Sequence, residues 1–159
     1  SCVFPADDRG LGMRISVQEA PFDLGAQTAR FAAGRTDMGA LVTFTGVVRD
    51  LPGDPLKLME IEHYPGMTQA ALEDIAGQAM ARFSLGDVLV IHRFGALKPG
   101  EMIMMVATAA PHRKDAFAGA EFLMDYLKSR APFWKREITA QGAEWVASTS
   151  EDEAALDRW

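Results

Sequence analysis

Residues 111–138, PHRKDAFAGAEFLMDYLKSRAPFWKREI, decide the fold, because two prolines mark where a long helix begins and where it stops. Pro111 is expected at or near the first helical position, where its missing N–H costs nothing. Pro132 ends the helix, since the residue before a proline, here Ala131, is pushed out of the helical region. The following residues, FWKREI, are therefore expected to run extended. The stretch predicts a long helix that passes directly into a strand.

The chain before this junction alternates between strand and helix patterns. A short strand is expected in MRISVQ (13–18) and a helix in FDLGAQTARFAA (22–33), whose apolar face contains Phe22, Ala26, Ala29 and Ala33. A clear strand, GALVTFTGVVRD (39–50), runs into a loop rich in Pro and Gly, and LKLMEIEHY (56–64) resumes the extended pattern. We expect these last two strands to form an antiparallel pair.

The strongest helix pattern is PGMTQAALEDIAGQAMARF (65–83), with Thr68 as its expected N-cap. Its apolar residues repeat every three or four positions as one buried stripe: Ala71, Leu72, Ile75, Ala76, Ala79, Met80 and Phe83. Apolar strands are expected in 87–95 and 101–110, a last strand in 143–148, and a short acidic tail in 151–159. This order predicts an α+β sandwich, a mostly antiparallel sheet with helices packed on one face.

The length of 159 residues fits one domain, which we assign to residues 13–159. Residues 1–12 show no periodicity and are interpreted as a cloning remnant or an upstream extension. They contain the single cysteine, Cys2, so the domain offers no disulfide, zinc-thiolate site or cysteine nucleophile. With only scattered histidines, no metal site is expected. A reducing cytoplasm fits this composition, and neither a signal peptide nor a membrane span is indicated.

Charge is distributed unevenly in this acidic protein. The net charge is −6, yet residues 111–136 hold six Lys/Arg against three Asp/Glu, so this segment is +3 and the rest is −9. Nucleic-acid binding favours an extended basic face, whereas a local basic region in an acidic chain favours a small anionic ligand in a cleft.

The centre of the basic region is the pair Lys128 and Lys135, flanked by Arg130 and Arg136. A lysine in the last turn of a helix is stabilised by about 0.3–1 kcal/mol, and this alone can explain Lys128. It does not explain the basic residues beyond the proline, whose mutual repulsion a bound phosphate or carboxylate would offset. Neighbouring lysines also lower each other's pKa and so supply neutral amine for nucleophilic or acid–base chemistry.

Two further basic groups are candidates for anion binding. His112 and Arg113 lie beside the free N–H groups of the helix's first turn. This turn is about 24 Å from the lysine pair along the helix, so either there are two sites or a dimer joins them. Arg49, at the end of a strand that enters a loop, is a third candidate, although an exposed loop arginine is the simpler interpretation. His63 and His92 are interpreted as structural histidines.

Five ordered blocks, VTFTGVVRD, IEHYPGMT, VIHRFGALKPGE, PHRKDAF and MDYLKSRAPFWKRE, resemble the catalytic (large) subunit family of molybdopterin synthases. The resemblance runs from Met13 to the C-terminus. It implies an α/β hammerhead-type fold and a heterotetramer, in which a homodimer of large subunits is flanked by two small ubiquitin-like sulfur carriers. Each carrier ends in a Gly-Gly thiocarboxylate. The implied reaction transfers two sulfurs to cyclic pyranopterin monophosphate, which forms the dithiolene of molybdopterin, with no cofactor.

The resemblance also implies the roles of individual residues. The two active-site lysines of the family match Lys128 and Lys135. The substrate-binding positions match these lysines together with Arg49, His112, Arg113, Arg136, Glu137 and the backbone of Val47 and Val48. Some members carry a basic residue near the last strand where this chain has Thr149, and Arg130 or Lys114 is the available substitute.

Two other classes of function are compatible with the basic cluster. The first is a non-catalytic α+β module that binds a small anion without chemistry. The second is RNA binding through PFWKRE, which predicts an affinity that falls steeply with salt and is disfavoured by the acidic remainder of the chain.

Overall fold

The computed structural model describes residues 13–53, 55–147 and 149–159, and the interpretation of residues 1–12 lies outside this part of the chain. The helices are α1 (Leu24–Ala32), α2 (Met67–Phe83), α3 (Arg113–Ser129) and α4 (Ser150–Ala155), with a 3₁₀ turn, η2 (Leu156–Arg158). The strands are β1 (Arg14–Gln18), β2 (Ala40–Val47), β3 (Leu56–His63), β4 (Asp87–Arg93), β5 (Gly95–Leu97), β6 (Met102–Ala110), β7 (Phe133–Thr139) and β8 (Gly142–Val146). No helix among these residues is long and apolar enough to cross a membrane.

The strands form two sheets. Sheet A has the order β1-β4-β6-β2, in which β1 and β4 are parallel and the other pairs are antiparallel. Sheet B has the order β5-β3-β7-β8 and is antiparallel throughout. The predicted α+β class, largely antiparallel, is therefore confirmed. The predicted pairing of β2 with β3 is wrong, because the loop after β2 carries the chain from sheet A into sheet B.

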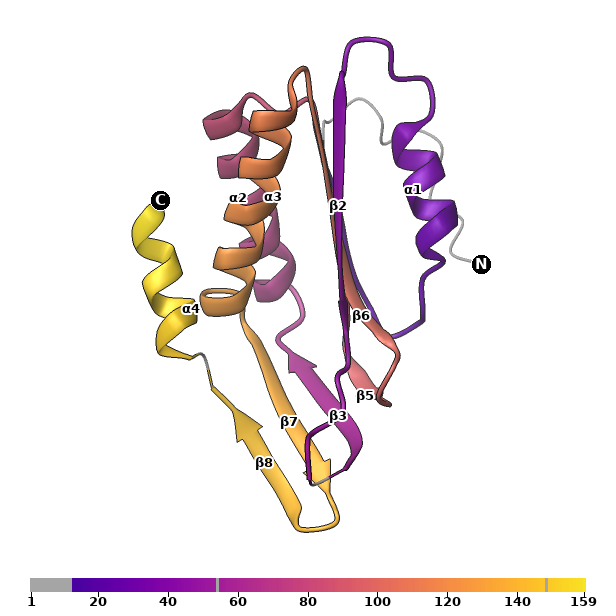
Figure 1. Cartoon of the computed structure of the whole chain (residues 1–159), viewed down its shortest axis with the longest axis vertical. Coiled ribbons are helices and arrows are strands. Elements are labelled where there is room, and N and C mark those ends of the chain that lie inside the picture. The colour runs from indigo at the N-terminus through magenta and orange to yellow at the C-terminus, as the bar shows by residue number, and fades with distance from the viewer. Residues whose placement is uncertain (1–12, 54, 148) are drawn as a thin grey trace.

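Helices cover both faces of sheet A, with α2 and α3 on one side and α1 on the other (Figure 1). Alternate residues of β4 pack on opposite faces: Val88 and Val90 contact the core beneath α2 and α3, whereas Leu89 and Ile91 contact the core beneath α1. The prediction that helices lie on one face is therefore wrong for α1. The continuous apolar run of β4 is explained by this burial on both sides.

The predicted faces of the helices agree with the structure for α2 but not for α1. In α2 the buried residues Leu72, Ile75, Ala76 and Ala79 belong to the predicted stripe. In α1 the buried residue is Phe31, whereas Ala26, Ala29 and Ala33 are exposed. The larger apolar surface of a phenylalanine outweighs that of the small alanines, so the helix turns Phe31 toward the sheet.

Some helix boundaries also differ from the predictions. Gly66 is the N-cap of α2, and Thr68 lies inside the helix as a buried residue. His112 is the N-cap of α3, so Pro111 precedes the helix instead of occupying its first turn. The acidic tail contains α4, which begins with a capping box formed by Thr149 and Asp152.

A tight contact between α3 and the loop after α2 gives a stability prediction. A Cβ atom at Gly119 of α3 would lie 2.7 Å from the Leu85 Cδ1 atom, whereas nothing lies within 4 Å of one at Gly77 of α2. Gly119→Ala is expected to lower the free energy of unfolding by about 1–3 kcal/mol. The matched change Gly77→Ala should raise it by about 0.5–1 kcal/mol through helix propensity. The free energy of unfolding of each variant, measured by urea denaturation, checks the two predictions. Equal changes at the two sites would contradict the tight contact between Gly119 and Leu85.

Candidate active site

The junction between α3 and β7 brings the two lysines of the basic region together. Lys128 lies in the last turn of α3, and Lys135 lies on β7 beyond the turn at Pro132. Thr68 of α2 fixes this turn, because its hydroxyl donates to the Pro132 carbonyl oxygen at 3.3 Å and accepts from the Tyr64 amide at 3.2 Å. Lys128 and Lys135 therefore line the same two cavities.

The two cavities differ in chemistry. One of about 300 Å³ lies between β2 and α3 and has a largely apolar lining that includes Phe44, Val47, Ile103, Met104, Met124 and Leu127. The other, of about 180 Å³, lies beneath the chain that leads into α4 and is lined by Ser129 and Asp152 among others. We call them the apolar cavity and the polar cavity. A ligand in either one would meet both lysines.

Burial changes the protonation of Lys135. Desolvation, and secondly the positive charge of Lys128, lower the pKa of the Lys135 ammonium, while the Asp152 carboxylate opposes this shift. A larger fraction of Lys135 is consequently a neutral amine than for an ordinary lysine. The site therefore combines a positive charge that can hold an anion with an amine that can accept a proton.

His92 of β4 forms a wall that both cavities share. Its ring is 4% exposed, stacks on Phe133 with centroids 3.7 Å apart, and has Nδ1 2.8 Å from the Arg93 carbonyl oxygen. Burial, followed by the charge of Lys135, lowers the pKa of His92 to about 3, so the ring is neutral near pH 7. The interpretation of His92 as a structural histidine missed its place beside the lysines.

Ser129 adds a polar group without a partner to the polar cavity. Its Oγ atom is buried and has no hydrogen-bond partner among the described residues. Buried hydroxyls are normally paired, so an unpaired one that lines a cavity is available to a bound ligand.

The other predicted site residues lie in several places. Val47 lines the apolar cavity. Val48 is buried, and its backbone is occupied, since its amide donates to the Glu101 carbonyl and its carbonyl accepts from the Gly100 amide. Arg49 is exposed in the loop that follows β2.

Residues His112 and Arg113 lie at the opposite end of α3 from the lysine pair and are exposed. Within one chain they line neither lysine cavity. Arg136 projects from the other face of β7, where its guanidinium donates to Glu60 and lies over the Trp145 ring. Glu137 lines a separate small cavity near the tip of the β7–β8 hairpin.

Asp152 was not predicted as a site residue because the sequence interpretation placed no helix in the acidic tail. A signal for it exists, since Thr149 and Asp152 have the Ser/Thr-x-x-acid spacing of a capping box. For His92 the signal is weaker. Alternation along β4 puts it on the same face as Val88 and Val90, but nothing local indicates a cavity there.

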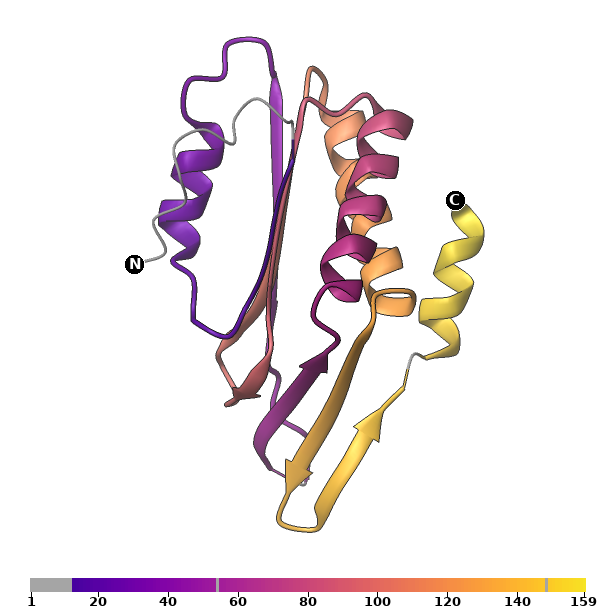
Figure 2. The ribbon, with the colours of Figure 1, turned by 180° about the vertical axis from the view of Figure 1, so that it is seen from behind.

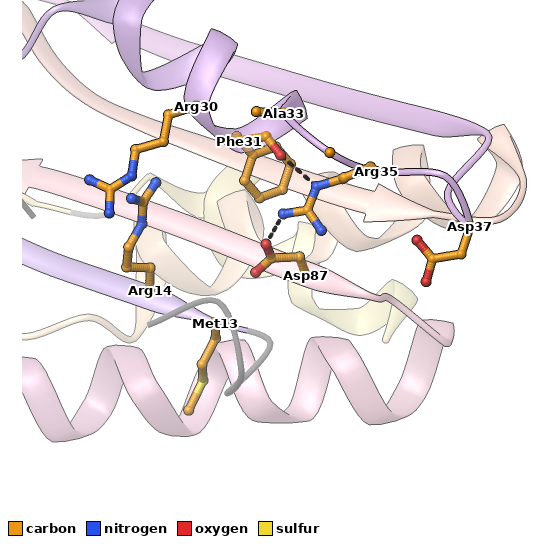
Figure 3. A pocket seen from close by; sticks show the side chains of 9 residues that line it. Met13, Arg14, Arg30, Phe31, Ala33, Arg35, Asp37 and Asp87 are labelled. Carbon is orange, nitrogen blue, oxygen red and sulfur yellow. Dashed lines mark hydrogen bonds and ion pairs between the residues drawn. The ribbon is translucent and has the colours of Figure 1, made fainter. Parts of the chain in front are cut away.

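A further cavity, of about 220 Å³, lies beside α1 and contains none of the predicted site residues. Figure 3 shows three arginines around it, Arg14, Arg30 and Arg35. Arg35 forms an ion pair with Asp87 and donates to the Phe31 carbonyl, which gives it a structural role. Within the described part of the chain, no three His, Cys, Asp or Glu side chains are grouped as metal ligands would be. The lysine cavities therefore remain the candidate site.

Comparison with known proteins shows the family of this chain. A model of the MoaE protein family matches residues 17–130. A molybdopterin synthase catalytic subunit from Cereibacter sphaeroides is 64% identical over 92% of this chain and 100% of that protein. The MoaE protein of Burkholderia ambifaria superposes with a TM-score of 0.79 at 51% identity, over 92% of this chain and 97% of that one. Molybdopterin synthase from Staphylococcus aureus gives 0.76 at 28% identity, over 83% and 96%.

Proposed function

Because the chain belongs to the MoaE family of molybdopterin synthase catalytic subunits, we propose that Lys128 and Lys135 promote sulfur transfer to cyclic pyranopterin monophosphate. The observation that carries this proposal is their convergence on two cavities that meet at their side chains. The product is the dithiolene of molybdopterin. The reaction needs two sulfurs, each of which replaces one oxygen of the substrate.

The sulfur comes from a partner protein in this proposal. Residues 13–159 contain no cysteine, so the domain has no thiol to carry sulfur itself. A small ubiquitin-like carrier with a C-terminal Gly-Gly thiocarboxylate supplies it and returns as a carboxylate, which balances the oxygen lost by the substrate. The relatives' description as a catalytic subunit supports assembly with a second kind of subunit. We place this assembly in the cytoplasm. A domain without cysteine forms no disulfide bonds and therefore does not need an oxidising compartment to fold.

The two lysines can contribute both protonation states of the side chain, the charged ammonium and the neutral amine. An ammonium group stabilises the oxyanion that develops as sulfur adds to the substrate, and its effect is large in a site that excludes water. The lowered pKa of Lys135 also allows it to exist as an amine, which accepts a proton during the displacement of oxygen. Ser129 offers an additional donor to the bound substrate.

The remaining basic residues bind the phosphate across a homodimer in this proposal. His112 and Arg113 are too far along α3 to reach the lysines of their own chain. One edge of sheet A is β2, which exposes Leu41, Phe44 and Val47, and Phe44 lies near the exposed Phe117 of α3. An apolar sheet edge of this kind is suited to pairing with a second copy. Such a dimer would bring His112 and Arg113 of the second chain to the lysine pair, while Arg49, Arg136 and Glu137 remain candidate contacts.

Reconstitution tests the function directly. The protein is mixed with a thiocarboxylated carrier and cyclic pyranopterin monophosphate, and dithiolene formation is measured. We expect product only when all three are present. The alternative, a non-catalytic anion-binding module, predicts pterin binding but no product. If Lys128→Ala binds the pterin as well as wild type and forms product at an unchanged rate, the catalytic assignment is wrong.

A shared site gives a separate prediction. Lys128→Ala and Arg113→Ala are expected to be inactive alone, but a refolded equimolar mixture should recover about a quarter of the wild-type rate. Half of the dimers are then hybrids, and each hybrid has one intact site. The control is a mixture of two Lys128→Ala preparations treated in the same way. Activity no higher in the hybrid mixture than in this control would contradict the shared site.

A further inference from the structure

Asp152 is the one acidic side chain among the residues that line the polar cavity. It lies in the first turn of α4, and its position is fixed by the capping box. Its Oδ2 atom accepts from the Thr149 amide at 3.1 Å, and its own amide donates to the Thr149 hydroxyl at 3.1 Å. The other carboxylate oxygen, Oδ1, takes no part in the capping box.

The segment that carries Asp152 is anchored to α3 by residues that follow the capping box. Arg130 donates to Glu153 at 3.0 Å, and Arg158 donates to Glu121 and Asp125 at 2.7 and 2.6 Å.

The C-terminal Trp159 packs edge-on against Phe83 and Phe122, and its Nε1 donates to Asp125 at 2.6 Å. Figure 2 shows α4 beside the lower ends of α2 and α3, near the start of β7. Exposed ion pairs are individually weak, but together with the partly buried indole they hold α4 in one place.

We propose that Asp152 is a positioning residue for Lys135, whose ammonium form it stabilises across the polar cavity. This role rests on the proposed function, and it adds a residue from the C-terminal helix to the lysine pair. Two cations that share a site repel each other, and a fixed carboxylate reduces that repulsion before substrate arrives. Asp152 thereby increases the fraction of Lys135 that carries a positive charge when the thiocarboxylate binds. The opposing effect of Asp152 on the pKa of Lys135 supports this role.

The other charged or titratable groups near Lys135 come from separate elements. Lys128 faces it from α3, and the neutral His92 faces it from β4. His63 of β3 acts on His92, and Glu137 lies two residues along the same face of β7. None of these groups belongs to α4, so a change at Asp152 can be separated from changes in them.

The charge and the capping box can be varied independently. Asp152→Asn keeps an acceptor for the Thr149 amide but removes the charge, and Asp152→Glu keeps both, because glutamate is a usual capping-box residue at this position. Glu151→Gln removes the same charge from the same turn of α4 but does not line the cavity. Thermal unfolding of the three variants verifies that α4 remains docked.

Competitive acetylation of Lys135, followed by mass spectrometry across pH, is the measurement. Only the neutral amine reacts, so Asp152→Asn should move the labelling midpoint to lower pH and raise labelling below the midpoint by roughly twofold or more. Asp152→Glu and Glu151→Gln should resemble wild type. In reconstituted dithiolene formation, the alkaline limb of the pH–rate profile should move in the same direction.

The outcomes separate the two proposals. If Asp152→Asn labels like wild type at every pH, or if Glu151→Gln moves the midpoint equally, the role of Asp152 is overturned. Failure of the wild-type protein to form dithiolene would overturn the proposed function, whereas the labelling result would still report whether Asp152 acts on Lys135.

Discussion

Lys135→Met is expected to lower the rate of dithiolene formation by about 10²- to 10³-fold. Methionine keeps the length and the apolar stem of lysine but removes both the charge and the amine. In the wild-type protein the desolvated amine lines the same cavity as Lys128, where it can stabilise an oxyanion or move a proton. The measurement is kcat/KM in the reconstituted reaction with a thiocarboxylated carrier.

The same variant should not lose stability. Burial of a charged group is costly, and desolvation is the main reason that the pKa of Lys135 is lowered. Methionine avoids this cost, so the unfolding midpoint of Lys135→Met is expected to equal or exceed that of wild type. Lys57→Met is the matched control, because Lys57 is an exposed lysine on β3 and lines no cavity at the site. A rate within about threefold of wild type in Lys135→Met would contradict the assignment.

Local patterns in the sequence predicted most of the elements, because these depend on residues close together in the chain. The period of α2, the α3 helix that ends before Pro132 and the two strands that follow this helix were all predicted and are confirmed. The partners of the strands were not predictable in the same way. Gly95, with φ +94°, turns the chain from β4 into β5 and hence from one sheet to the other, and no periodicity reports such a change of sheet.

In the candidate site, too, residues close together in the sequence were predicted together, whereas residues brought together only by folding were missed. Lys128 and Lys135 could be predicted together because only six residues and one turn separate them. His92 of β4 and Asp152 of α4 both line the polar cavity, and only the packing of sheet A, sheet B and α3 brings them there. Arg136 was grouped with the lysines by its place in the sequence, but alternation along β7 directs it to the other face of the sheet.

Acid is expected to destabilise this protein through His92, with the largest stability effect that we predict. The pKa of this histidine is about 3 in the folded protein and 6.5 in the unfolded chain, because burial and the charge of Lys135 oppose protonation. Between these values the unfolded chain binds more protons, so the free energy of unfolding falls as the pH falls. The contribution is complete above pH 6.5 and is lost at about 1.4 kcal/mol per pH unit below it, on the order of 5 kcal/mol in total.

His92→Gln tests this dependence because glutamine is neutral at every pH. The substitution also disturbs the stacking on Phe133, and it therefore lowers stability by an amount that is constant with pH. The decisive quantity is the slope of the unfolding free energy against pH, measured by urea denaturation between pH 6.5 and about 4. We expect the slope of wild type to exceed that of His92→Gln by about 1.4 kcal/mol per pH unit. Parallel slopes would mean that His92 is protonated as readily in the folded protein as in the unfolded chain, and hence that burial does not keep this ring neutral beside the lysines.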